Sequence, residues 1–154
     1  MRIAFLANRD IHSNFALNIL TNKLSHHSMT IYLSDHVGKK RSDFIELNQL
    51  RFIEQALFND IVFSAIEKSP SALKRFLTFH ELGDQTGNGV IPLNEINSND
   101  GIEKLQSSDP DLIVSIRYGT IIQSAVIAIP RFGILNLHSG ILPQYRGVMA
   151  TFWA

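Results

Sequence analysis

Residues 109–138 read DPDLIVSIRYGTIIQSAVIAIPRFGILNLH, and two apolar runs within this stretch decide the fold class. The first is Leu112–Ile116 and the second is 134–138, and both are rich in the branched aliphatic residues that favour strands. Asp109-Pro110 marks a turn before the first run. The segment 121–129 between the two runs predicts a short helix. The stretch therefore predicts a strand–helix–strand unit.

The same alternation continues upstream. Continuous apolar strands that alternate with helices are typical of a parallel sheet covered on both faces. The sequence therefore predicts an α/β, Rossmann-like fold with a mostly parallel sheet flanked by helices, in one domain over residues 1–154. The further expected strands are 2–7 and 30–33, with short extended pieces at 77–79 and 90–93; the expected helices are 13–24, 43–69 and 100–108; a glycine-containing loop is expected at 83–89.

Composition excludes several classes of protein. The chain of 154 residues is 45% hydrophobic, which suits a single globular core. It has no cysteine, so disulfides, zinc–thiolate sites and a thiol nucleophile are excluded, and a cytoplasmic location is expected. The apolar stretch between Arg117 and Arg131 is 13 residues long, whereas a bilayer span needs about 20. We expect no membrane association and no metal site.

The net charge is zero but unevenly spread. Residues 1–41, 42–116 and 117–154 carry formal charges of +4, −7 and +3. The last segment contains no acid, which would suit an anionic ligand. An uneven spread without functional meaning is the alternative.

The loop after the first strand, residues 8–13, contains no glycine, so the Gly-rich fingerprint of a dinucleotide site is absent. Ser13-Asn14 opens a helix, where it serves either as the helix cap or as a phosphate-binding turn.

The candidate catalytic residues lie in the stretch 134–147, which reads ILNLHSGILPQYRG. Side chains at i and i+2 of a strand share a face, so Asn136 and His138 project side by side. They lie at the carboxyl end of a strand, where open α/β sheets place their sites. An amide and an imidazole there can both donate hydrogen bonds to one developing oxyanion, and the imidazole can also transfer a proton.

The pattern N-x-H-x-x-x-L-P-x-Y-R-G over residues 136–147 resembles the formyltransferase family, and residues 109–122 are similar to the strand and loop that precede it in that family. The family includes glycinamide ribonucleotide, methionyl-tRNA and amino-sugar-nucleotide formyltransferases, and formyltetrahydrofolate hydrolases and dehydrogenases. The resemblance implies transfer of a formyl group from 10-formyltetrahydrofolate to an amine. It also implies that Asn136 binds the oxyanion and that His138 is the catalytic histidine.

The resemblance implies further site residues. Arg146 matches a loop position that shapes the pocket, where it contacts the substrate or fixes the loop by a salt bridge. The Leu142-Pro143 bond is expected to be cis. The residues that match the family's pterin-binding loop are Tyr118, Gly119, Thr120, Ile121 and Ile122.

The family's third catalytic residue, an Asp, and its final strands are expected beyond Ala154. The chain is thus expected to be an incomplete N-terminal catalytic domain, and whether it is active as it stands is open.

The acceptor amine is also open. Trp153, after Arg146-Gly147, resembles the methionyl-tRNA and sugar-nucleotide branches, and we lean towards an amino-sugar nucleotide. The zero net charge is a weak argument against tRNA, whose binding favours a basic face. The alternatives are methionyl-tRNA or glycinamide ribonucleotide as acceptor, hydrolysis of the same formyl donor, and a non-catalytic remnant. Folate and the acceptor are the expected partners, and a homodimer remains open.

Overall fold

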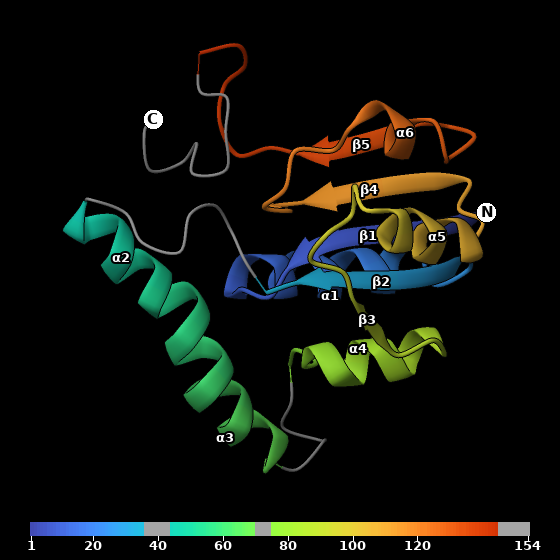
Figure 1. The fold of residues 1–154 in the computed structure, drawn as a ribbon. Helices are drawn as coiled ribbons and strands as arrows, with labels where there is room; N and C mark the ends of the chain where they lie inside the picture. Colours follow the sequence, from blue (N-terminus) through green and yellow to red (C-terminus); the bar gives the residue numbers. More distant parts are fainter. Residues whose placement is uncertain (36–43, 70–74, 145–154) are drawn as a thin grey trace.

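The computed structural model describes residues 1–35, 44–69 and 75–144, and it shows a parallel sheet between two layers of helices (Figure 1). The elements in chain order are β1 (Arg2–Asn8), α1 (Ile11–Lys23), β2 (Ser28–Ser34), α2 (Ile45–Arg51), η1 (Phe52–Val62), α3 (Phe63–Glu67), α4 (Phe79–Thr86), β3 (Val90–Pro92), α5 (Asn99–Ser107), β4 (Leu112–Ile116), α6 (Ser124–Ile127) and β5 (Ile134–Leu137).

The sheet has five strands in the order β3-β2-β1-β4-β5, and every neighbouring pair is parallel. The chain first builds outward from β1 through β2 to β3, and then returns to the other side of β1 with β4 and β5. The winding therefore reverses between β1 and β4, where open α/β sheets leave a crevice at the carboxyl ends of the strands. The predicted Rossmann-like α/β fold is confirmed.

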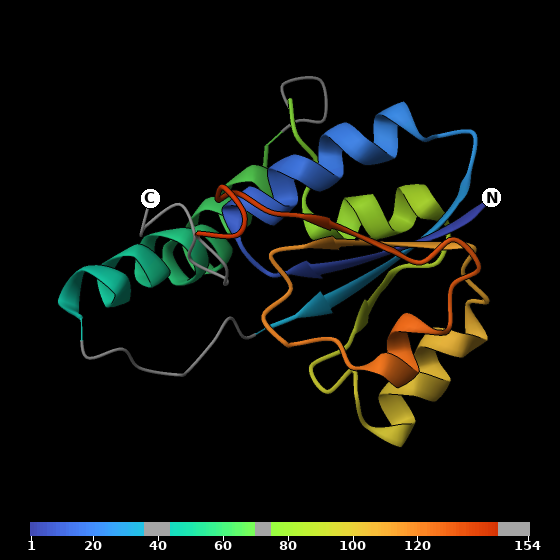
Figure 2. The ribbon, with the colours of Figure 1, turned by 90° about the horizontal axis from the view of Figure 1, so that it is seen from above.

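The alternation of side chains along β1 explains the two layers. Ile3, Phe5 and Ala7 belong to one hydrophobic cluster, and Ala4 and Leu6 belong to the other. Helices α1 and α4, together with η1 and α3, supply the first cluster, whereas α5 and α6 supply the second. Figure 2 shows these two groups on opposite sides of the sheet. The helix-borne members of the clusters include Leu17, Phe58, Phe63 and Leu82 on one face and Leu105 and Val126 on the other.

Two helix starts differ from the expected ones. The carboxylate of Asp10 accepts a hydrogen bond from Ser13 N at 2.8 Å, so Asp10 caps α1 in place of Ser13-Asn14. The N-terminus of α1 is thus already occupied by a carboxylate, which also argues against the phosphate-binding alternative. Helix α5 begins after Ser98, whose hydroxyl accepts from Gly101 N at 3.0 Å. Both caps lie two or three residues before the positions that the sequence pattern indicated.

Other local expectations were also wrong in part. Residues 77–79 form no strand, because Thr78 caps helix α4 through a capping box with Glu81. The predicted helix over 43–69 is present, but its middle part, η1, is π-helical, and Asp43 lies outside the described residues. The helix expected over 121–129 is confined to α6.

None of the helices in residues 1–35, 44–69 and 75–144 is long and apolar enough to cross a membrane.

A glycine inside α4 gives a stability prediction. A Cβ at Gly83 would lie 2.6 Å from the backbone of Gly89 and Val90, whose atoms cannot rotate away. Alanine gains about 1 kcal/mol of helix propensity over glycine. The clash is expected to outweigh that gain, so Gly83→Ala should lower the free energy of unfolding by about 1–3 kcal/mol. Urea denaturation checks this, with exposed Gln85→Ala in the same helix as the control; an unchanged or raised stability for Gly83→Ala would contradict it.

Candidate functional site

A pocket of about 320 Å³ lies at the carboxyl ends of β4 and β5. This is the edge of the sheet where a doubly wound fold places its ligands. Both members of the Asn136/His138 pair are among the residues around it. The complete lining is Arg117, Tyr118, Gly119, Thr120, Ile121, Asn136, Leu137, His138, Ser139 and Leu142.

Strand β5 brings Asn136 and His138 to the pocket. Asn136 lies inside the strand, paired with Ser115 of β4, and His138 follows immediately after the last residue of the strand. Asn136 is exposed and His138 is half-buried. Both residues line the pocket, and so does Leu137 between them. The Leu142-Pro143 bond is cis, as expected, and Leu142 also lines the pocket.

The loop after β4 forms the opposite wall. Tyr118, Gly119, Thr120 and Ile121 line the pocket, as the resemblance implies. Ile122 is not among the residues that line this pocket, and it packs against the core cluster on the α5 and α6 face. Its assignment to the pterin site stays a prediction.

Two anchors hold this loop from within the fold. The Tyr118 ring is buried in the core, and its hydroxyl donates a hydrogen bond to the Leu93 carbonyl oxygen. Asn97 accepts from Gln123 N at 2.9 Å and donates to the Ile121 carbonyl oxygen at 2.8 Å. The Tyr118 hydroxyl is therefore engaged inside the protein, and Tyr118 can contribute only its backbone and the accessible part of its ring to the pocket.

Tyr118 gives the second prediction. Burial raises the pKa of its hydroxyl, so the folded state favours the neutral phenol. Tyr118→Phe loses the hydrogen bond to Leu93 and should lower the free energy of unfolding by about 1 kcal/mol at neutral pH. In the unfolded chain the tyrosine hydroxyl has a pKa of about 10. The contribution of Tyr118 to the free energy of unfolding is fully present below that pH and is lost as the pH rises above it.

The difference between wild type and Tyr118→Phe should therefore shrink above about pH 10. Chemical denaturation at pH 7 and at pH 11 measures it. The pKa of Tyr32 is raised as well, but it is common to both proteins and cancels in the comparison. A difference that grows with pH would contradict the assignment.

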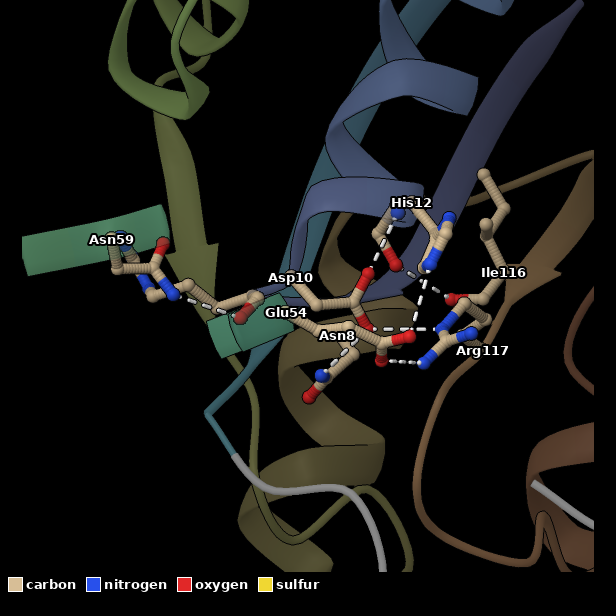
Figure 3. Close-up of polar contacts among 9 residues, drawn as sticks. Asn8, Asp10, His12, Glu54, Asn59, Ile116 and Arg117 are labelled. Atoms are coloured by element: carbon tan, nitrogen blue, oxygen red, sulfur yellow. Dashed lines mark hydrogen bonds and ion pairs between the residues drawn. The ribbon is translucent and has the colours of Figure 1, made fainter. Parts of the chain in front are cut away.

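A charged cluster beside the pocket was not predicted. It consists of Asp10, His12, Glu54 and Arg117, and we call it the Arg117 cluster (Figure 3). The Arg117 Nε lies 3.1 Å from an oxygen of Asp10, and its Nη2 lies 2.6 Å from an oxygen of Glu54. The other oxygen of Glu54 lies 3.0 Å from His12 Nε2.

Two of the three arginines in the acid-free segment 117–154 make contacts within the described chain. Arg117 is engaged by two carboxylates. Arg131 lies over the Phe132 ring, 5.0 Å from its centroid. Arg146 lies outside the described residues, so its assignment stays a prediction. Within the described ranges, no three His, Asp or Glu side chains come together as a metal site would require.

Comparison with known proteins agrees with the motifs. Residues 44–154 match the formyl transferase family. A methionyl-tRNA formyltransferase of Methylacidiphilum infernorum is 40% identical over 81 residues, which are 53% of this chain and 23% of that protein. A methionyl-tRNA formyltransferase of Ehrlichia canis is 32% identical over 96 residues, which are 60% of this chain and 32% of that protein.

A third relative, the methionyl-tRNA formyltransferase of Citrifermentans bemidjiense, is 35% identical over 72 residues, 47% of this chain and 23% of that protein. The chain thus spans less than a third of the length of these relatives. The family match covers more than half of the chain and includes the whole pocket. The chain belongs to the formyl transferase family.

Proposed function

We propose that the protein transfers a formyl group from 10-formyltetrahydrofolate to an amine, with Asn136 and His138 as its catalytic residues. The observation that carries the proposal is that both residues line one pocket together with the loop Tyr118, Gly119, Thr120 and Ile121. The family membership of the chain supports the same reaction.

The chemistry requires two things of the protein. The acceptor nitrogen forms a bond to the formyl carbon and the bond to the nitrogen of tetrahydrofolate breaks, so negative charge develops on the formyl oxygen on the way. The side-chain amide of Asn136 donates a hydrogen bond to that oxygen, which lowers the barrier. His138 accepts the proton that the acceptor amine loses and returns it to the departing nitrogen.

The pocket fits the reacting end of the formyl donor. A volume of about 320 Å³ is at the small end of ligand pockets and can take a pterin ring with its formyl-bearing arm. Ile121 and Leu142 offer apolar surface to the ring, and the backbone around Gly119 offers hydrogen-bonding groups to its polar edge. The glutamate tail would then lie outside this pocket.

For the acceptor, the relatives favour methionyl-tRNA. All three relatives named above carry that activity in their names, whereas the sequence alone leaned towards an amino-sugar nucleotide. We therefore place methionyl-tRNA first. The amino-sugar nucleotide stays the second candidate, because the zero net charge of the chain is an argument against a tRNA acceptor.

The test is an assay of the protein at the full length that its gene encodes. It measures formyl transfer to methionyl-tRNA and to a nucleoside-diphosphate amino sugar in parallel, and formate release without an acceptor. The proposal expects transfer to methionyl-tRNA. Transfer to the sugar alone would support the second candidate, formate release alone would identify a hydrolase, and a lack of any product would refute catalysis.

A further inference from the structure

The Arg117 cluster lies where the winding of the sheet reverses, between β1 and β4. Asp10 follows β1, and Arg117 follows β4, so the two residues meet at the carboxyl ends of adjacent central strands (Figure 3). Glu54 reaches the same point from η1, which lies far away in the sequence. The place where this type of sheet usually holds a ligand thus holds an internal ion-pair network.

The network is built for a guanidinium. The side chain of Asp10 is fully buried, and those of Glu54 and Arg117 are only 9% and 16% exposed. The planar fork of arginine presents separate N–H groups to two carboxylates at once, which the single ammonium of lysine cannot match. Breaking one side of such a buried pair leaves a charge without its partner.

The Arg117 backbone connects this network to the pocket. Arg117 has a φ of 54°, a left-handed conformation that residues with a Cβ rarely adopt. Such conformations persist where the surroundings enforce them, and they cluster at functional sites. The next residues, Tyr118 to Ile121, form one wall of the pocket, and Arg117 itself belongs to the lining. The carboxylates that hold the guanidinium therefore also set the start of the pocket wall.

Given the proposed function, we propose that Glu54 and Asp10 are positioning residues for the formyl donor, which act through Arg117 on the 117–121 loop. Neither carboxylate is in the pocket lining, so their effect on the formyl donor is indirect. Asp10 also caps α1, and its substitution would disturb that helix. Glu54 and Arg117 are therefore the positions to test.

The experiment compares Glu54→Gln and Arg117→Lys with wild type in the protein at the full length that its gene encodes. Formyl transfer is measured at saturating acceptor over a range of 10-formyltetrahydrofolate concentrations, and calorimetry measures the binding of 5-formyltetrahydrofolate, a stable isomer. We expect both the formyl-donor KM and the calorimetric Kd to rise about tenfold in each variant. The kcat should stay within about twofold, because Asn136 in β5 and His138 directly after it lie on another segment of the chain.

A matched control lies at the other end of the same two strands. Arg2 of β1 pairs with Asp111, just before β4, at the amino end of the sheet. Asp111→Asn removes a carboxylate from an arginine pair between the same strands, but away from the pocket. It should leave KM and Kd within about twofold of wild type. A loss in Glu54→Gln that Asp111→Asn matches would mean a general effect on the fold and would overturn the proposal.

The double variant Glu54→Gln/Arg117→Lys separates positioning from independent effects. Because Glu54 acts through Arg117, the double variant should bind the formyl donor about as weakly as the weaker single variant. The inference would be overturned if the loss of formyl-donor affinity in the double variant equalled the product of the two single losses. It would also be overturned if the single variants kept the KM and Kd of wild type. If wild type binds the formyl donor without transferring it, the proposed reaction fails while the Kd comparison still tests positioning. Wild type that does not bind it refutes both.

Discussion

Replacing His138 with alanine is expected to reduce formyl transfer by at least ~100-fold, the low end of what a positioned acid–base group contributes. The reason is that the amine must lose a proton as the carbon–nitrogen bond forms, and His138, directly after β5, lines the pocket. A steady-state assay at saturating substrates in the protein at its full encoded length measures kcat.

The control for this substitution is His80→Ala. His80 lies in α4 with a largely exposed side chain beside Asp84, and it has no part in the pocket. Its loss should leave kcat within about twofold of wild type. The His138→Ala variant should still bind 5-formyltetrahydrofolate, because the proposed pterin contacts lie in residues 118–121. Near-wild-type turnover of His138→Ala would show that the proposed mechanism is wrong, whatever the fold.

The strands could be predicted because their signal is local. Leu112–Ile116 is apolar except for Ser115, and every residue of a central parallel strand faces one of two covered sides. Helix α4 was missed although its capping box, Thr78 with Glu81, is legible in the sequence. The glycines at 83 and 87 led to the prediction of a loop over 83–89 in its place. Gly83 is inside the helix because the backbone of Gly89 passes too close for a Cβ, and Gly87 ends it with a φ of 78°.

The same distinction applies to the site. Asn136 and His138 could be predicted as a pair because positions two apart in the strand expected over 134–138 share a face by its period alone. Asp10, Glu54 and Arg117 of the Arg117 cluster come from segments far apart in the sequence, so they meet only in the folded chain. A weak signal was present for two of them, since Asp10 and Arg117 directly follow apolar strands. Glu54 lies in an otherwise helical stretch and carried none.

Asn136→Ala is the second substitution with a large expected effect, a loss of ~100-fold or more in kcat. Asn136 is exposed and lines the pocket, and its side-chain amide is a hydrogen-bond donor without a charge of its own. It therefore interacts weakly with the uncharged formyl group and more strongly with the oxygen as its negative charge grows. Because this gain arises at the transition state, kcat should fall while the formyl-donor Kd stays within about twofold.

The double variant Asn136→Ala/His138→Ala decides whether the two residues act as one unit. If both serve the same developing charge, each substitution removes part of one stabilisation, and the double variant should be less impaired than the product of the two single losses. The assay is the same steady-state measurement, with calorimetry to confirm that the formyl donor still binds. Losses that multiply in full would mean that Asn136 and His138 act in separate steps. In that case the shared oxyanion site would have to be abandoned, even with both residues confirmed as catalytic.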